Sequence, residues 1–272
     1  KDGYTYYRKA GMVRLPIRLG QDVFEHGKIK SETRKRFIEG MHAYSHYLKV
    51  HGVKDFRAVA TSAMREASNG DKIVAQVAKE TGIAIEIITG KEEARLVFNS
   101  KIYDIIKATE KNYIYIDVGG GSTEISIIQN RKVEASKSFR VGGVRLLNNL
   151  VQQEEWTRME HWLQKNAAPI TDKAAIGAGG NINKLYSISG AKTGKSISYE
   201  TMKEIYKEME PLTVDERMKK YTVKEDRAEV IVPALTIYNA ICKWANITEI
   251  HVPKIGLADG LIHHLYDMVV HD

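Results

Sequence analysis

Hydrophobic residues alternate with other residues on both sides of a glycine-rich segment near the middle of the chain. They stand at Ile114, Ile116 and Val118 before this segment, and at Ile125 and Ile127 after it. A period of two is typical of β-strands, so the pattern predicts two strands joined by a short turn.

The predicted turn, Gly119–Ser122, contains three consecutive glycines, and carboxylates flank it at Asp117 and Glu124. Glycine can adopt positive φ, which lets backbone N–H groups approach an anion closely. Two carboxylates would repel a phosphate group unless a hard cation such as Mg²⁺ lay between them. The pattern favours a phosphate and metal site, and the alternative is a tight hairpin whose acids face solvent.

The rest of the chain alternates between helical and extended patterns, which is typical of an α/β fold. The first half predicts helices over 31–50, 72–81 and 91–107, and strands over 56–60 and 83–88. The second half predicts strands within 113–139, helices near 142–149 and 153–165, a strand ending near Gly177, helices up to Trp244, a strand over 249–252 and a helix from Leu257. Because the polar run 109–112 separates two self-sufficient patterns, we expect two domains, 1–111 and 112–272.

Composition narrows the class of protein. The 272 residues include 43% apolar residues, enough for buried cores, and Lys and Arg exceed Asp and Glu by 41 to 34. This balance favours polyanionic partners. The basic residues are spread along the chain without a nucleic-acid-binding motif, so a phosphate-rich small molecule or polymer fits equally well.

No apolar run approaches the ~18 residues that a membrane span needs, and the sequence opens without a signal peptide. We therefore expect a cytoplasmic protein with no membrane partner. The only cysteine, Cys242, excludes a disulfide within the chain and is predicted to be a core residue.

Four pieces of the sequence occur in a recognisable order: Ala-Thr-Ser-Ala-Met-Arg-Glu-Ala at 60–67, Glu-Glu-Ala-Arg at 92–95, the turn with its acids at 117–124, and Ile-Gly-Ala-Gly-Gly-Asn at 176–181. Together they closely resemble the Ppx/GppA family of exopolyphosphatases and guanosine pentaphosphate phosphohydrolases, in the actin, sugar kinase and Hsp70 superfamily. Matches at 18–23, 227–231 and 256–260 extend the resemblance over nearly the whole chain.

The resemblance implies two ribonuclease-H-like domains with the substrate in the cleft between them, and a last helix that packs back on the first domain. It implies that Glu93 is the catalytic base and that Arg65 binds phosphate. It also implies Mg²⁺ ligands at Asp117 and Glu124, and a phosphate loop made of Gly119, Gly120, Gly121 and Ser122.

The chemistry of the residues is compatible with these roles, because phosphoryl transfer depends on charge neutralisation, a planar cation and a base. From the residues alone, Glu92, Glu93 and Arg95 could instead form a solvated first helical turn, and Arg65 could lie on the surface.

A second glycine turn contains Gly179, Gly180 and Asn181, and lies between a predicted strand and a predicted helix. This position fits a backbone cradle for a phosphate or a nucleotide. A purely structural strand-to-helix turn is the alternative.

Two further patterns are weaker. The segment 190–196 suggests a phosphate-binding P-loop, but the spacing of its glycines is wrong, so we expect a basic loop. His42, His46 and His51 fall on one predicted helix without an evident carboxylate partner, which predicts a solvated or partly packed face rather than a metal site.

The family's first phosphate loop, expected before 18–23, is absent from the sequence, which we interpret as starting after it. A protein that truly lacked this loop would hydrolyse weakly or not at all. Longer members of the resembled family add a helical domain after the catalytic pair, and we expect this chain to be a short form with two domains.

The leading hypothesis is a Mg²⁺-dependent exopolyphosphatase that releases terminal phosphate from inorganic polyphosphate. Guanosine pentaphosphate 5′-phosphohydrolase activity is one alternative, and a non-catalytic polyphosphate or alarmone sensor is another. An actin-like ATPase or kinase would share the glycine turns but would not explain the pieces at 60–67 and 92–95. The resemblance is also compatible with a homodimer.

Overall fold

The computed structural model describes residues 10–97, 111–254 and 256–271. The strands are β1 (Ala58–Ala60), β2 (Ile85–Ile87), β3 (Asn112–Val118), β4 (Thr123–Gln129), β5 (Lys132–Phe139), β6 (Lys173–Ala178), β7 (Ile197–Ser198) and β8 (Glu249–His251). The helices are α1 (Leu19–His26), α2 (Ser31–Val50), α3 (Ser62–Glu66), α4 (Gly70–Thr81), α5 (Gly90–Val97), α7 (Gly143–Leu147), α8 (Gln153–Asn166), α9 (Gly180–Ile188), α10 (Tyr199–Met209), α11 (Val214–Tyr221), α12 (Glu225–Trp244) and α13 (Leu257–His271).

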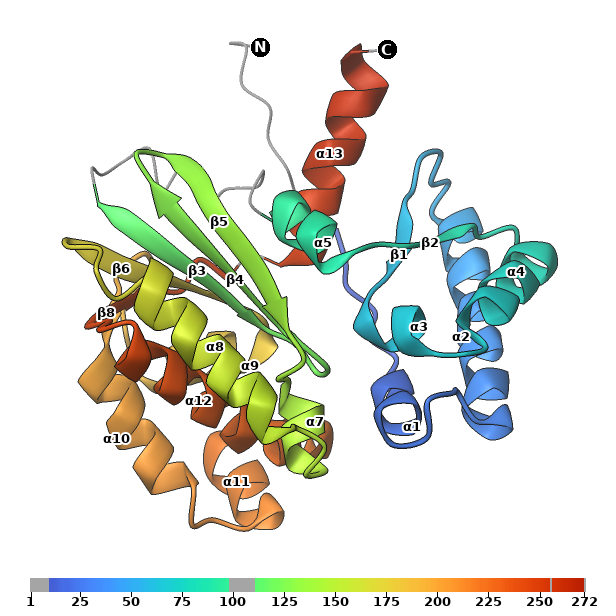
Figure 1. Ribbon diagram of the computed structural model, residues 1–272. Coiled ribbons are helices and arrows are strands. Elements are labelled where there is room, and N and C mark those ends of the chain that lie inside the picture. The colour runs from blue at the N-terminus through green and yellow to red at the C-terminus, as the bar shows by residue number, and fades with distance from the viewer. Residues whose placement is uncertain (1–9, 98–110, 255, 272) are drawn as a thin grey trace.

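The larger sheet has the strand order β5-β4-β3-β6-β8-β7 (Figure 1). Strands β3, β4 and β5 form an antiparallel meander, β6 and β8 continue the sheet in parallel, and β7 closes one edge in the antiparallel direction. An antiparallel meander followed by parallel strands is the order of a ribonuclease-H-like sheet. Its central strand β3 ends at the glycine turn predicted from the sequence.

Both faces of the central strand β3 are buried. The alternation in β3 directs Ile114 and Ile116 into the main core, where α8, α9 and α12 cover the sheet (Figure 1). Tyr113 and Tyr115 point to the opposite face, into a second buried cluster to which Leu257 contributes. Burial on both sides explains why β3 is apolar or aromatic along most of its length.

The buried Tyr238 of α12 joins the two central strands. Its hydroxyl donates to the carbonyls of Ile116 in β3, at 2.9 Å, and Ala178 in β6, at 2.7 Å. Ala178 directly precedes the second glycine turn, and Ile116 lies three residues before the first, so the helix layer supports the sheet close to both turns.

The smaller sheet consists of the parallel strands β1 and β2, with α2, α3 and α4 packed beside them. Helix α4 ends where the sequence predicts, because Gly82 adopts φ 75° and its N–H bonds the carbonyl of Ala78 at 3.1 Å. The two parts of the molecule meet along α5, which lies against β4, β5 and the C-terminal helix α13 (Figure 1).

The structure agrees with most of the predicted elements and corrects others. The strands expected over 56–60 and 83–88 are shorter, and the sequence pattern does not predict α1 or β7. The helix expected over 91–107 is seen to Val97, and its remainder, like most of the expected domain boundary near 108–112, falls outside the described residues. Segment 190–196 is a loop between α9 and β7, as expected.

The expectation that the histidines of α2 have no carboxylate partner is wrong for His42. Its Nε2 lies 3.3 Å from a carboxylate oxygen of Glu80 on α4, which packs beside α2. The two residues are far apart in sequence, so only the packing of the helices reveals the pair.

Cys242 lies in the core, as predicted, where burial raises the pKa of its thiol to about 12. None of the described helices has the length and apolar character needed to cross a bilayer.

Candidate active site

Three carboxylates of the predicted site share one electrostatic environment. Asp117, the last but one residue of β3, lies directly opposite Glu124, the second residue of β4, while Glu93 comes from the first turn of α5. Burial, together with the negative charges of Glu124 and Asp117, raises the pKa of Glu93 to about 8. Burial is also the main reason that the pKa of Glu124 rises to about 7 and that the pKa of Asp117 is raised.

Glu124 is held by two serine hydroxyls. Ser122 in the turn and Ser138 on β5 each donate to its Oε1 atom at 2.8 Å. Ser138 stands opposite Glu124 in the β4–β5 ladder, and the sequence reasoning missed it. The pairing register of β5 with β4, counted from the predicted hairpin, could have placed Ser138 opposite Glu124.

Gly90 allows α5 to begin close to Glu124. A Cβ at this position would lie 3.3 Å from Glu124 Oε1 and 3.2 Å from the Cβ of Ser138. A larger residue would push the start of α5, and with it Glu93, away from the hairpin. This close approach is why Glu93 is half-buried and lies among acids rather than fully exposed on a helical turn.

Asp117 contacts the second glycine turn. Gly179 adopts φ 98°, which favours glycine, and a Cβ there would lie 3.1 Å from Asp117 Oδ1. On its other side, the hydroxyl of Tyr115 donates to Asp117 Oδ2 at 3.1 Å. The next turn residue, Gly180, lies against the guanidinium of Arg227. The two glycine turns therefore lie on either side of Asp117, as their positions at the ends of the neighbouring strands β3 and β6 require.

Asn181, the third predicted residue of this second turn, lies in the first turn of α9. Its side-chain oxygen is buried and has no hydrogen-bond partner within the described residues. Buried polar atoms are usually paired, so this oxygen is suited to a bound group or an ordered water molecule.

Arg65 of α3 reaches the same acids. One guanidinium nitrogen donates to the carbonyl of Ile88, just after β2, and the positive charge lowers the pKa of both Glu93 and Glu124. A fixed guanidinium beside carboxylates can bind phosphate oxygens with two parallel hydrogen bonds.

The loop Gly119–Ser122 is shaped by its backbone. The N–H of Gly119 bonds the carbonyl of Ser122 at 2.9 Å, and the N–H groups of Gly143 and Val144 in α7 bond the carbonyls of Gly119 and Gly120, each at 2.9 Å. A Cβ at Gly142 would collide with the backbone of Gly120 and Gly121. The packing of α7 thus holds the loop, a role that the sequence pattern does not reveal.

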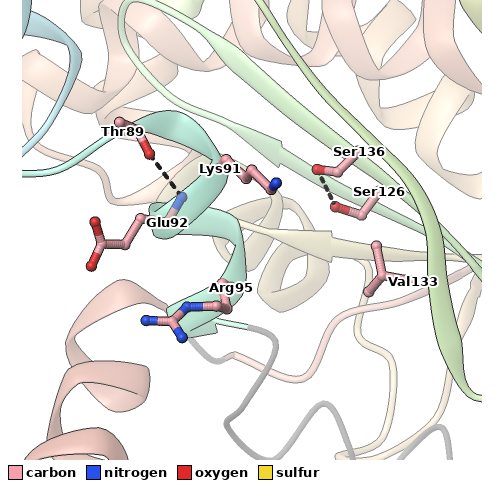
Figure 2. Close-up of a pocket in the computed structure, with 7 residues that line it drawn as sticks. All are labelled: Thr89, Lys91, Glu92, Arg95, Ser126, Val133 and Ser136. Atoms are coloured by element: carbon pink, nitrogen blue, oxygen red, sulfur yellow. Dashed lines mark hydrogen bonds between the residues drawn. The ribbon is translucent and has the colours of Figure 1, made fainter.

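Glu92 and Arg95 lie on a different face of α5 from Glu93. With Thr89 and Lys91 they line a cavity of about 560 Å³, completed by Ser126, Ser136 and Val133 of β4 and β5 (Figure 2). Glu92 lies 3.6 Å from the guanidinium of Arg57. Arg95 is exposed, whereas Glu92 and Glu93 are both half-buried in different surroundings, so the alternative of a solvated first helical turn describes only Arg95.

Within the described residues, no three His, Cys, Asp or Glu side chains are close enough together to hold a metal ion. Mg²⁺ is usually bound by one or two carboxylates, with waters and substrate phosphates as the other ligands. Asp117 and Glu124 face each other across an antiparallel ladder, and two like charges there are unfavourable without a proton or a cation. The donor set therefore fits one hard divalent cation.

The ribonuclease-H-like sheet, the acids at its central strands and the two glycine turns define an α/β protein with an acidic site between two glycine turns. Residues 13–269 match the Ppx/GppA phosphatase family. The chain therefore belongs to this family.

Individual relatives agree with this assignment. Exopolyphosphatase 2 of Mycobacterium tuberculosis is 35% identical over 149 residues, 53% of this chain and 46% of that protein. Guanosine-5′-triphosphate,3′-diphosphate pyrophosphatase of Aliivibrio fischeri is 24% identical over 279 residues, 96% of this chain and 54% of that protein. The chain thus spans only about half the length of each.

The crystal structure of an exopolyphosphatase from Cytophaga hutchinsonii is similar in fold. It superposes with a TM-score of 0.78 at 23% identity, covering 94% of this chain and 88% of that chain. The predicted α/β fold class is confirmed.

Proposed function

We propose that the protein is a Mg²⁺-dependent exopolyphosphatase that releases the terminal phosphate of inorganic polyphosphate by attack of water. The observation that carries the proposal is the meeting of Glu93, Asp117 and Glu124 beside Arg65, between two glycine turns. Each component that phosphoryl transfer needs is represented: a base, a cation ligand set, a planar cation and backbone donors.

In this mechanism Glu93 accepts a proton from the attacking water. A general base works best when its pKa is near the working pH, and the raised pKa of about 8 brings Glu93 into that range. The water oxygen bonds the terminal phosphorus while the bond to the bridging oxygen breaks. The products are orthophosphate and a polyphosphate one unit shorter, and the proton leaves Glu93 for the products or solvent.

Arg65 and the loop Gly119–Ser122 orient the terminal phosphate. The guanidinium binds two of its oxygens, and the loop offers the backbone N–H groups of Gly120 and Gly121, which have no side-chain bulk. Asp117 and Glu124 would hold Mg²⁺. When bound, the ion neutralises the negative charge of the substrate, which otherwise repels the three acids.

Guanosine pentaphosphate is the second candidate substrate, because it also presents a terminal phosphate. The similarity to the Aliivibrio pyrophosphatase over 96% of this chain favours it. A sensor that binds polyphosphate or an alarmone without hydrolysis is the non-enzymatic alternative. The cytoplasmic location and the homodimer stay predictions.

Phosphate release by the wild-type protein, Glu93→Gln and Glu92→Gln tests the proposal. Long-chain polyphosphate, guanosine pentaphosphate and ATP are offered separately with Mg²⁺. We expect release from polyphosphate by the wild type, a loss of at least 100-fold in Glu93→Gln, and near wild-type rates in Glu92→Gln, whose side chain lines the other cavity.

The other outcomes separate the alternatives. Phosphate release from guanosine pentaphosphate alone would identify that compound as the substrate. Phosphate release from ATP alone would refute the proposed exopolyphosphatase activity. Polyphosphate binding without release from any substrate would favour the sensor.

A further inference from the structure

Arg145 of α7 is buried, with 4% of its surface exposed, and it joins the phosphate loop to the opposite part of the molecule. Its Nε donates to the carbonyl of Gly121 at 2.8 Å. Its Nη2 donates to the Glu66 carboxylate of α3 at 2.5 Å. The guanidinium carbon lies 4.1 Å from the ring centroid of Phe24 in α1. One side chain thus contacts the loop, α3 and α1 together.

The partner of Arg145 is the next residue after Arg65. Arg65 and Glu66 are consecutive in the short helix α3, so the ion pair that fixes Glu66 also restrains the backbone that carries Arg65. The start of the same helix contacts the loop, because a Cβ at Gly121 would lie 2.9 Å from Ser62 Oγ. Helix α3 and the phosphate loop are therefore in direct contact.

A neighbouring arginine shows why this pair differs from an ordinary surface ion pair. Arg140 also donates to Glu66, at 2.7 Å, but 65% of its side chain is exposed. Exposed pairs contribute little because water screens them and the long side chains lose entropy. The Arg145 side chain is 5% exposed, so removing the charge of Glu66 leaves a buried cation without its counter-charge.

We propose that the Glu66–Arg145 ion pair is a latch that sets the position of Arg65 relative to the loop Gly119–Ser122. This inference rests on the proposed function, in which Arg65 and the loop hold the same phosphate. Glu66 and Arg145 are positioning residues that do not contact the substrate. Because small displacements of a group that orients a substrate can lower the rate by about 10²-fold, the latch is expected to affect turnover strongly.

Hydrogen exchange of the full chain, without substrate, tests the latch directly. Compared with the wild type, Glu66→Gln and Arg145→Lys are expected to exchange at least tenfold faster in peptides covering 119–122 and 62–66. Lysine keeps the charge, but it lacks the fork that reaches Gly121 and Glu66 together. The matched control, Arg140→Gln, removes the exposed partner of Glu66 and is expected to exchange at the wild-type rate. Thermal unfolding checks that each variant is folded.

A kinetic cycle tests whether the latch acts through Arg65. We expect Glu66→Gln to lower kcat for terminal phosphate release at least tenfold in the wild type, but less than threefold in an Arg65→Lys background. Equal losses in the two backgrounds would overturn the positioning role. Unchanged exchange at 119–122 in Glu66→Gln would refute the latch itself. If the wild type releases no phosphate, the proposed function fails while the exchange measurement still decides whether the latch exists.

Discussion

Replacing Glu93 with glutamine is expected to stabilise the protein at alkaline pH while it removes activity. The folded protein binds the Glu93 proton more tightly than the unfolded chain, because burial and two neighbouring acids raise its pKa from 4.5 to about 8. Its contribution to stability is therefore fully present below pH 4.5 and is lost as the pH rises through 8. Glutamine does not ionise and escapes this loss.

The size of the effect follows from the pKa. The full difference between about 8 and 4.5 corresponds to an upper limit of about 5 kcal/mol. Between pH 6 and pH 9, about 3 kcal/mol of this contribution to the free energy of unfolding is lost. Because Glu124 titrates nearby and shares the repulsion, we assign about 2 kcal/mol of this loss to Glu93.

Urea unfolding at pH 6 and pH 9, with a chelator to remove divalent metal, measures this difference. The free energy of unfolding of Glu93→Gln, relative to the wild type, should rise by about 2 kcal/mol between the two pH values. Glu92→Gln serves as the control, and its free energy of unfolding should change with pH as that of the wild type does. Parallel curves for the wild type and Glu93→Gln would show that Glu93 is solvated, and the interpretation of its burial would be wrong.

Three further predictions concern groups around Glu93. Mg²⁺ should raise Tm more at pH 8 than at pH 6. At pH 6 Glu124, with a pKa of about 7, is mostly protonated and cannot bind the ion. An equal rise in Tm at both pH values would argue against Glu124 as a ligand. Gly179→Ala should destabilise the fold by about 1–3 kcal/mol, measured by urea unfolding, and lower kcat at least tenfold. The reason is that φ 98° is strained for alanine and that the added Cβ crowds Asp117. Wild-type stability and kcat in this variant would contradict the prediction. Ser138→Ala should weaken Mg²⁺ binding by about two- to tenfold in calorimetry, because the ionised Glu124 carboxylate loses one hydrogen bond. An unchanged affinity would show that Ser138 does not support Glu124 as a metal ligand.

The regular parts of the fold were predictable because their patterns are local. Strict alternation at Ile114, Ile116 and Val118 is seen as β3, and Gly82 ends α4 in the left-handed conformation that favours glycine. The loop 190–196 was predictable from its spacing and flanking helix. Short or irregular elements such as α1 and β7 carry too few periodic residues to give such a signal.

The candidate site was only partly predictable. The resemblance selected Glu93 over Glu92, but the sequence could not show that these neighbours lie in different environments, because that depends on where α5 contacts the hairpin. Ser138 depends on the register of a third strand, and the carboxylate partner of His42 lies on another helix.

By itself, the sequence determined the family, the α/β class and the order of the acids, the arginine and the glycine turns along the chain, because each is a local pattern of residues. Only the tertiary structure decided that Glu93 lies beside Asp117 and Glu124, which hydroxyls hold Glu124, and that Arg145 reaches Glu66 beside Arg65. Burial, pKa and ion pairing depend on distances between segments far apart in sequence, and packing alone sets those distances.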